Sequence, residues 1–373
     1  MTCPDCQYAA KFHSYQTSRV LTVHGEMQVR RAYYRCARCP QSFIPYDAAM
    51  GLHNSISPGF RPLICLAGVL APFADAAEDI VHRYTGVRLS ASTVLRCTEA
   101  EGERLRAQSR CGRMVEPTVP EPGWTKPREH GEPAAYVGLD AFSVPMQGAG
   151  AGPAEHRMLY TALVYTPDKK HHRYLVDFDL DVLAEQLRSQ VRACGLKDVG
   201  QLVAITDGGN GLEEALQRHL SDKLTTVLDW YHAAEHLCDF AAVAWGSDEA
   251  TRTQWADNAK GILYEQGGEA LLTHLRSMVV PTAPPAAEEL RKLIGYFENN
   301  RHRTDYPGYR AKNWDIGSGP TEAGCKIIGE RLKGSGMRWV EEGAATVAAL
   351  RALYVSGGKL WDSFWSQAYS VAA

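Results

Sequence analysis

The sequence predicts a mixed α/β fold in which a central sheet is joined to a small metal-binding unit and to helical regions. Three observations lead to this fold class. Two Cys-x-x-Cys pairs enclose strand-like stretches near the N-terminus, apolar strands alternate with helical patterns from residue 135, and the chain after residue 229 is almost wholly helical. A length of 373 residues allows two or three domains of ordinary size.

The composition is that of an ordinary globular protein, and the net charge of −3 is not that of a generally basic nucleic-acid-binding protein. Basic residues are clustered locally, however, and such clusters matter more for binding a phosphate backbone than the net charge of the whole chain does. The longest uncharged apolar run, residues 62–74, is too short to span a bilayer, and no signal-peptide pattern opens the chain. We therefore expect a cytoplasmic, nucleoid-associated protein without a membrane partner.

The first predicted unit, residues 1–50, is a zinc ribbon. Two Cys-x-x-Cys knuckles lie at the ends of a predicted hairpin. Four thiolates suit a tetrahedral Zn²⁺, which replaces the hydrophobic core that so small a unit lacks. The alternative is a redox pair or four incidental cysteines. A DNA contact and a purely structural or protein-binding role all stay open for the ribbon, whose basic residues include Arg30, Arg31, Arg35 and Arg38. The expected zinc ligands are Cys3, Cys6, Cys36 and Cys39.

Residues 57–112 are predicted to be helical. Helical spacing of apolar residues from Phe73 to Tyr84 stops at Gly86, and a second helix capped by Ser90 or Ser92 is expected to follow. This order is typical of a helix-turn-helix, with a plain αα-hairpin as the equal alternative. Residues 113–134, rich in proline, are predicted to be a linker. The basic residues that would face DNA here are Arg88, Arg96 and Arg104.

The sheet-forming core is predicted to begin at residue 135. The order β-β-β-α-β-α-β is that of a ribonuclease H-like catalytic core with a mixed five-stranded sheet. Residues 135–230 form its first part in this prediction, residues 231–310 an all-helical insertion, and residues 311–373 the closing helices. The strands are expected at 136–144, 159–165, 174–178, 202–206 and 225–228, with helices at 182–194 and 212–220.

Three carboxylates stand at the ends of these predicted elements. Asp140 lies in the first apolar strand, Asp207 ends the fourth, and Glu322 lies near the start of a helix expected over 321–332. A lone ionised aspartate in an apolar strand requires compensation. Carboxylate oxygens are the ligands that Mg²⁺ and Mn²⁺ prefer, and two such ions catalyse phosphoryl transfer. The alternative for each residue is an ordinary cap or surface carboxylate, and for Asp207 a strand-end residue in a turn. Glu330 is the competing candidate for the third carboxylate in place of Glu322.

Further polar residues lie beside this predicted site. Asp229 ends the fifth strand, and His232 follows it at a position from which an imidazole would hold a phosphate or relay a proton. A capping aspartate with a core histidine is the alternative. If the helix at 321–332 continues regularly, Lys326 and Lys333 share the face of its glutamate. The basic residues expected to bind DNA are Lys326, Arg331, Lys333, Arg338, Arg30, Arg31 and Arg96.

These segments resemble a bacterial insertion-sequence DDE transposase. The Asp-x-x-His element and the helical insertion before the glutamate are similar to those of the Mutator-like superfamily, within it the family called ISKra-four. The resemblance implies a catalytic triad of Asp140, Asp207 and Glu322, with Asp229 and His232 as an accessory pair. The residues that carry it are Gly138-Leu139-Asp140, Ile205-Thr206-Asp207-Gly208, Asp229-Trp230-Tyr231-His232, Gly317-Ser318-Gly319-Pro320-Thr321-Glu322 and the stretch from Arg331 to Trp339.

The resemblance also implies a reaction and partners. It implies cleavage at the terminal inverted repeats of a transposon and transfer of the 3′-hydroxyl ends into target DNA. The partner would be double-stranded DNA, and at least a homodimer is expected because a synaptic complex holds two ends. Two alternatives stay open: a domesticated or inactive DNA-binding protein that keeps the fold, and a related nuclease without strand transfer.

Overall fold

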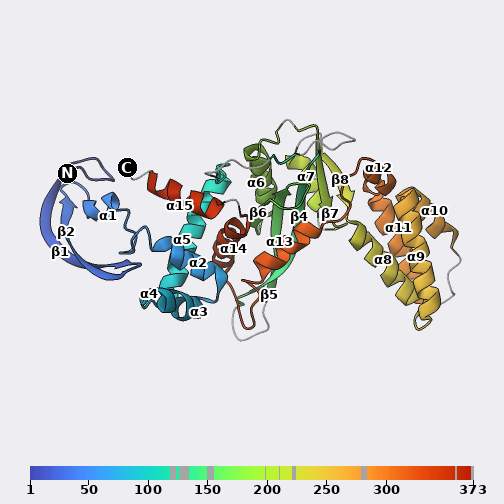
Figure 1. Ribbon diagram of the computed structural model, residues 1–373, viewed down its shortest axis with the longest axis horizontal. Coiled ribbons are helices and arrows are strands. Elements are labelled where there is room, and N and C mark those ends of the chain that lie inside the picture. Colours follow the sequence, from blue (N-terminus) through green and yellow to red (C-terminus); the bar gives the residue numbers. More distant parts are fainter. Residues whose placement is uncertain are drawn as a thin grey trace. The chain divides into compact units, whose positions relative to one another are not determined.

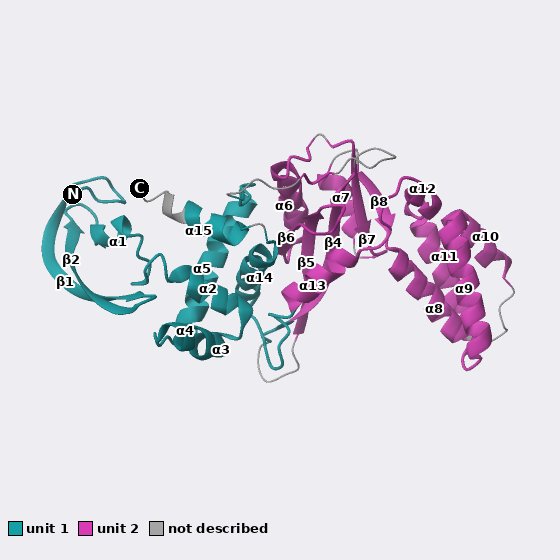
Figure 2. Ribbon diagram, viewed as in Figure 1, with its two compact units in different colours: residues 1–120, 145–154, 330–373 teal, residues 121–144, 155–329 magenta. Residues whose placement is uncertain are grey.

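The structure is a computed structural model that describes residues 1–117, 123–125, 134–148, 155–197, 199–209, 211–220, 224–278, 284–357 and 359–370. Most of the predicted proline-rich linker lies outside the described residues, including Pro120, Pro122, Pro127 and Pro133. Two compact units divide the chain (Figure 2). Unit 1 contains residues 1–120, 145–154 and 330–373, and unit 2 contains residues 121–144 and 155–329.

Unit 1 begins with a three-stranded antiparallel sheet in the order β1-β2-β3, of which Figure 1 labels β1 and β2. Strands β1 (Ala10–Thr22) and β2 (Gly25–Cys36) form a long hairpin. Gly25 opens β2 with a φ of +117°, a conformation that other residues rarely adopt. Strand β3 (Ser42–Phe43) pairs with the end of β2, and the short helix α1 (Pro45–Ala49) follows it.

Helices complete unit 1. They are α2 (Arg61–Leu70), α3 (Phe73–Asp75), the π-helical segment η1 (Ala76–His82), α4 (Arg83–Thr85), α5 (Ala91–Arg110), α14 (Glu341–Val355) and α15 (Leu360–Ser370). Ser90 caps α5 by accepting a hydrogen bond from the Thr93 N–H at 3.1 Å, which confirms one of the two predicted caps. Gly102 lets the backbone of α14 approach α5 closely, because a Cβ at Gly102 would lie 2.4 Å from the Thr346 carbonyl oxygen.

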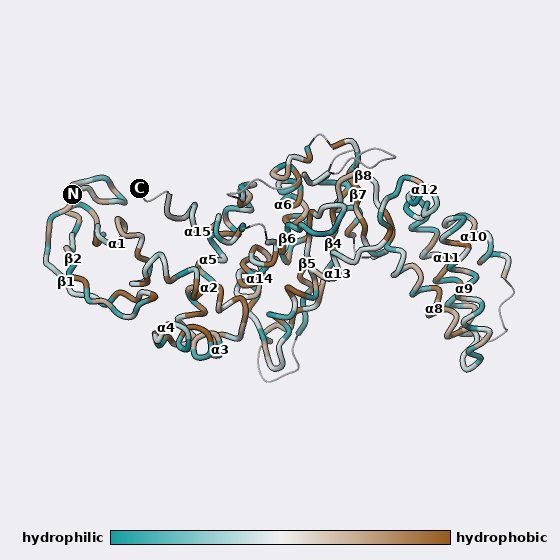
Figure 3. Tube along the Cα trace, in the orientation of Figure 1, coloured by the Kyte–Doolittle hydropathy of each residue, from teal (hydrophilic) through white to brown (hydrophobic). Residues whose placement is uncertain are grey.

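Unit 2 contains a mixed five-stranded sheet in the order β6-β5-β4-β7-β8, which confirms the predicted mixed sheet. Strands β4 (Ala134–Met146), β7 (Gln201–Thr206) and β8 (Leu224–Leu228) run parallel, and β5 (Glu155–Tyr165) is antiparallel to β6 (His172–Asp177). Strand β7 is buried almost throughout, and such a run of apolar residues is typical of a central parallel strand. Figure 3 colours the chain by hydropathy.

Helices pack on this sheet and continue beyond its last strand. Helix α6 packs on the sheet through Leu183 and Leu187, which lie one turn apart on its apolar face. The helical segments of unit 2 are α6 (Leu180–Ala193), α7 (Leu212–His219), α8 (Trp230–Trp245), α9 (Glu249–Gln266), α10 (Gly268–Ser277), α11 (Pro284–Asn299), the 3₁₀ segment η2 (Arg301–Arg303), α12 (Tyr306–Ala311) and α13 (Gly319–Gly329).

Helix α13 differs from its prediction at the C-terminal end. The helix expected to reach Leu332 ends at Gly329, a residue with low helix propensity. Lys333 therefore lies outside the helix, and the expectation that it shares a helical face with Glu322 is corrected. None of the helices in the described part of the chain is long and apolar enough to cross a membrane.

Candidate functional site

Three aspartates lie level with one another across three neighbouring parallel strands. Gly138 of β4 pairs with Ile205 of β7, and Ile205 pairs with Val227 of β8. The carboxyl ends of parallel strands form one edge of a sheet, where functional side chains commonly gather. The residues two places beyond these three partners are Asp140, Asp207 and Asp229.

Asp140 is partly buried near the middle of β4, and its Oδ1 accepts a hydrogen bond from the Ala141 N–H at 2.7 Å. Burial raises the pKa of its carboxyl, and the negative charge of Asp207 raises it further, while the nearby His232 lowers it. The structure therefore brings Asp140 and Asp207 close enough to repel each other. Such repulsion is relieved by a bound cation.

Helix α13 lies directly over β4. Gly138 has no side chain, and a Cβ there would lie 1.9 Å from Thr321 Oγ1 and 2.6 Å from Leu163 Cδ2. Gly324 of α13 makes similar room for the ring of Tyr174 on β6, which lies 2.4 Å from the position of its missing Cβ. These two glycines allow the helix and the sheet to approach more closely than side chains would permit.

Glu322 is exposed in the first turn of α13, where Ser318 Oγ donates a hydrogen bond to its Oε1 at 3.1 Å. Cys325, three residues further on, interacts with the Asp140 carboxylate. Because residues three apart are neighbours on a helix surface, Glu322 lies next to the residue that contacts Asp140. The competing Glu330 lies beyond the end of α13 and pairs with an arginine of α14 at 3.6 Å.

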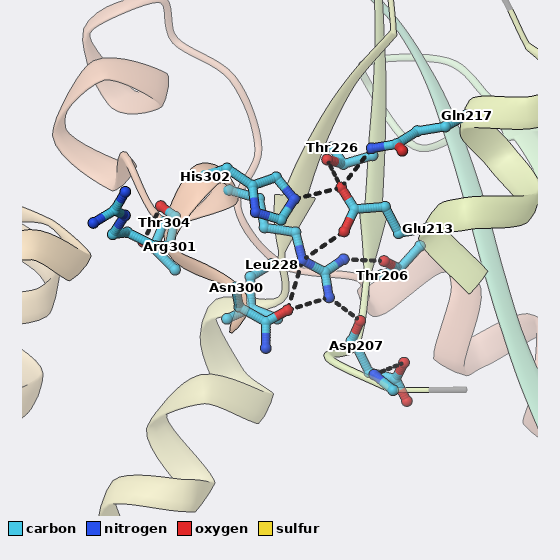
Figure 4. A network of polar contacts seen from close by, with 12 residues as sticks. Thr206, Asp207, Glu213, Gln217, Thr226, Leu228, Asn300, Arg301, His302 and Thr304 are labelled. Carbon is cyan, nitrogen blue, oxygen red and sulfur yellow. Dashed lines mark hydrogen bonds and ion pairs between the residues drawn. The ribbon is translucent and has the colours of Figure 1, made fainter. Parts of the chain in front are cut away.

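Asp207 is held through its backbone by a buried arginine that the sequence analysis missed. Arg303 is 2% exposed and donates hydrogen bonds to the Asp207 carbonyl oxygen at 2.8 Å and to Thr206 Oγ1 at 2.9 Å. Figure 4 labels the two acceptor residues, Thr206 and Asp207. It also donates to Asn300 Oδ1 and lies 3.5 Å from a carboxylate oxygen of Glu213. Arg303 thereby ties the segment after α11 to the carboxyl end of β7.

The carboxylate of Glu213 on α7 balances the positive charge of this buried arginine. Its carboxylate accepts hydrogen bonds from Thr226 at 2.5 Å and from His302 at 2.8 Å. Burial raises the pKa of Glu213, but these two hydrogen bonds and the charge of Arg303 lower it by more, so the net pKa lies below its ordinary value. The pair stays charged at neutral pH, and the network in Figure 4 is an ionic support for the strand ends.

Asp229 is 1% exposed and joins two helix starts. Its Oδ1 accepts a hydrogen bond from the His232 N–H at 2.9 Å, which caps α8, and its Oδ2 accepts one from the Ser318 N–H at 2.5 Å, just before α13. The capping role that the sequence left open is therefore present. One carboxylate fixes the helix that carries His232 and the helix that carries Glu322.

Two histidines of α8 lie near the same strand ends. The rings of His232 and His236 are 4.9 Å apart, and His236 lies 4.1 Å from the ring of Tyr296 on α11. Burial and the proximity of His232 lower the pKa of His236, while Asp207 acts in the opposite direction. His236 was missed in the sequence analysis, and its spacing of one helical turn from His232 was the available signal.

The four predicted zinc ligands come together in unit 1. The sulfur atoms of Cys3 and Cys39 are 3.7 Å apart, those of Cys6 and Cys36 are 3.4 Å apart, and all four lie within 4.8 Å of one another. Backbone N–H groups of Cys39 and Arg38 donate to Cys36 Sγ and lower the pKa of that thiol to about 6. The cluster fits four thiolates around one tetrahedral zinc ion.

The carboxylate site is more open than the cysteine cluster. In the part of the chain that the structure describes, the four cysteines are the one group of three or more His, Cys, Asp or Glu side chains gathered as for a metal ion. Asp140, Asp207 and Glu322 do not form a comparably closed group. The strand register positions Asp140 and Asp207 relative to each other, and α13 positions Glu322.

The predicted DNA-binding residues fall into two groups. Arg31 is 6% exposed and pairs with Asp47. Arg331 is 3% exposed, lies over the rings of Phe73 and Trp339, and donates to a backbone oxygen of α2 at 2.8 Å. Both expectations are corrected, because a buried guanidinium does not reach a phosphate backbone. The exposed members are Lys326, Lys333, Arg338, Arg30 and Arg96.

In the predicted helix-turn-helix, Arg104 is also engaged within the fold. Its guanidinium lies 3.7 Å from the ring centroid of Phe364 and pairs with Glu101 at 2.7 Å. Arg88 is exposed and lies 3.6 Å from Glu78. Arg104, one of the three arginines expected to face DNA in this region, is therefore used for packing within the fold.

Comparison with known proteins does not assign a family or a function to this chain. No protein-family model and no curated protein matches this chain. A functional assignment therefore depends on the residues and geometry described above.

Proposed function

We propose that the chain is a metal-dependent DNA transposase of the DDE type, with a ribonuclease H-like core and an all-helical insertion between β8 and α13. The observation that carries this proposal is that Asp140, near the middle of β4, lies level with Asp207 and Asp229, which directly follow the neighbouring parallel strands β7 and β8. The sheet order β6-β5-β4-β7-β8 and the helix bearing Glu322 over β4 support it.

The donor atoms suit hard divalent cations. Carboxylate oxygens bind Mg²⁺ or Mn²⁺ while the ion keeps several waters, so an open group of a few carboxylates is sufficient. The Asp207 charge contributes to the raised pKa of Asp140, which is the repulsion that such ions would remove. Asp140 would hold both ions, and Asp207 and Glu322 would each hold one. When bound, the ions would activate the attacking oxygen and stabilise the leaving oxygen.

The remaining residues of the site position these groups. Arg303 fixes the backbone of Asp207, and Asp229 fixes the first turns of α8 and α13. Asp229 therefore acts as a positioning residue. His232 is partly exposed and acts electrostatically on Asp140. In this proposal its imidazole would hydrogen-bond a phosphate oxygen or accept a proton from the attacking group.

A basic residue beside the glutamate supports a nucleic-acid substrate. Lys326 and Glu322 are both exposed and lie four residues apart on α13, so they share a helix face. An ammonium group there would contact a phosphate next to the metal-binding carboxylates. The substrate class that fits is a DNA strand whose phosphodiester lies beside Asp140 of β4 and the carboxyl end of β7.

The substitution Asp140→Asn tests the proposal. The substrate is a duplex carrying the inverted repeats that flank the coding DNA, incubated with Mn²⁺ and separated on a denaturing gel. We expect cleavage to fall by at least about a hundredfold while DNA binding stays within about twofold. The control Asp257→Asn removes an exposed carboxylate of α9 and should change neither. Unchanged cleavage by the Asp140 variant would overturn the metal assignment.

The products of the same assay separate the alternatives. Joined strands identify a transposase, because strand transfer links the 3′-hydroxyl end to a second duplex. Hydrolysed ends without joined strands identify a nuclease. Binding without cleavage in the wild-type chain identifies an inactive DNA-binding protein that keeps the fold.

A further inference from the structure

A row of aromatic rings crosses one face of the antiparallel sheet in unit 1. Phe12 of β1 pairs with Tyr34 of β2, and Tyr34 pairs with Phe43 of β3. The ring centroids of these neighbours are 5.9 and 6.0 Å apart. The register shift between Phe12 and Ser14 brings Tyr15 to the same face, 5.2 Å from Phe12. We call Phe12, Tyr15, Tyr34 and Phe43 the aromatic row.

The β1 end of the aromatic row is open to solvent. Phe12 is 50% exposed and Tyr15 is 59% exposed, whereas Tyr34 and Phe43 are partly buried. Aromatic pairs across strands stabilise a hairpin by about 0.2–1 kcal/mol each, but that role does not require half of the Phe12 and Tyr15 side chains to face water. The opposite face of the sheet differs, because Arg31 there is buried against Asp47 of α1.

The row lies in a positively charged ribbon. From Ala10 to Cys36 the sequence contains five Lys or Arg residues and one acidic residue, Glu26. The guanidinium of Arg30 lies 4.3 Å above the ring centroid of Tyr15, and Glu26 is paired with Arg19 at 3.1 Å. Exposed rings offer surfaces on which bases stack, and adjacent arginines attract the phosphates that link those bases.

We propose that the aromatic row binds single-stranded DNA by stacking unpaired bases on its rings. Paired bases in a duplex hide their faces from such rings, so the row should select unpaired strands. Arg30 contributes a phosphate contact beside Tyr15. This inference goes beyond the proposed function, because it concerns a surface of unit 1 and requires none of the carboxylates in unit 2.

Fluorescence anisotropy of the full zinc-loaded chain with a labelled oligodeoxythymidine of about 20 nucleotides, longer than a typical binding site, provides the test. Tyr15→Ala and Phe12→Ala should each weaken binding by about tenfold, whereas Tyr15→Phe keeps the ring and should stay within about twofold. The control Met27→Ala alters a 55% exposed residue on the opposite face of the ribbon and should leave the affinity unchanged. Duplex affinity should not change in the ring variants.

The salt dependence of binding distinguishes the contribution of the aromatic rings from that of the Arg30 charge. Arg30→Ala should reduce the slope of log affinity against log salt by about 0.7, whereas the ring variants should leave the slope unaltered. Zinc content and circular dichroism establish that each variant is folded. An oligonucleotide containing 5-iodouracil, photo-crosslinked to the unsubstituted chain and mapped by mass spectrometry, gives an independent readout.

Crosslinks to Phe12 or Tyr15 would support the proposal even if a ring variant failed to fold. Three results would overturn it: no binding of the oligonucleotide by the wild-type chain, equal affinity of folded Tyr15→Ala and wild type, or crosslinks confined to residues outside 1–50. An Asp140→Asn chain should bind the oligonucleotide with the affinity of wild type. The binding proposal is therefore tested independently of the catalytic proposal.

Discussion

Replacing Gly138 with alanine tests how closely α13 packs on β4. The new Cβ would lie 1.9 Å from Thr321 Oγ1 and 2.6 Å from Leu163 Cδ2. Carbon atoms in ordinary contact are about 3.5–4 Å apart, so the helix must move by roughly 1.5 Å. Strand β4 cannot yield instead, because Gly138 pairs with Ile205 inside the sheet.

The expected size of the effect follows from this displacement. Overpacking a tight core costs about 1–3 kcal/mol. In a unit of about 200 residues each kcal/mol lowers Tm by about 2–4 °C, so Gly138→Ala should lower the Tm of unit 2 by about 2–12 °C. Because α13 carries Glu322, and a misplacement of about 1 Å can cost a hundredfold in rate, DNA cleavage should fall by about that factor.

Calorimetry and the cleavage assay measure both effects. Thr321→Ala removes the nearest clashing atom, so the double variant Gly138→Ala/Thr321→Ala should recover part of the lost stability. Gly261→Ala on α9 is the matched control, because no atom lies within 4 Å of its missing Cβ and alanine favours a helix. A Gly138→Ala chain with wild-type Tm and wild-type cleavage would refute the close contact between α13 and β4.

Three further predictions concern the metal, the ionic support and a buried arginine. The purified chain should contain about one zinc ion, and Cys36→Ser should lower the zinc content measured by mass spectrometry; a metal-free but folded ribbon would contradict the cluster. Glu213→Gln should destabilise unit 2 by about 2 kcal/mol at pH 7, because it removes a charged partner of Arg303. The folded-state pKa of Glu213 is lowered, so this stabilisation is present above its ordinary pKa and is lost as pH falls through the folded value. Unfolding midpoints of wild type and variant should therefore converge below about pH 4, and a constant difference would be inconsistent with the ion pair. Arg331→Ala should lower the stability of unit 1 and leave the salt dependence of DNA binding unchanged; a smaller salt slope in a filter-binding assay would place Arg331 on phosphate instead.

The strands and their terminal aspartates are predictable from local sequence. Each strand is an apolar run bounded by turn residues, and parallel pairing brings residues at the ends of such runs to one edge. Asp207 follows directly from that reasoning, whereas Asp140 is indicated by its position as a lone carboxylate inside an apolar strand, near the middle of β4. Asp229 was placed correctly at a strand end, but its two capping hydrogen bonds depend on Ser318, which is far away in the sequence.

Buried charges are not predictable in this way. Arg331 lies in a basic stretch that is typical of a DNA contact, and it is covered because Phe73 and Trp339 pack on its guanidinium. Arg303 lies in a short 3₁₀ segment without apolar periodicity, so no local pattern indicates that it contacts Asp207. Whether solvent or a ring covers an arginine depends on segments that are distant in sequence.

Helix ends and strand faces show the same limit. Gly324 and Gly329 are equally poor helix residues, yet α13 continues through the first, where the ring of Tyr174 occupies the space, and ends at the second. The aromatic row depends on the register shift after Phe12, which simple alternation along β1 does not reveal. Irregularities of one residue decide which side chains share a face.

The packing of α13 on β4 has a consequence for the chain during its synthesis. Glu322 leaves the ribosome roughly 180 residues after Asp140, which at about 5–20 residues per second is an interval of roughly 10–40 s. During that interval the slot over Gly138 is unfilled and apolar residues of the sheet are uncovered. A product that stops before Gly319 keeps that slot open permanently, so we expect it to bind chaperones and to be degraded faster than the full chain. Such a product also lacks Glu322, the third carboxylate of the proposed metal site.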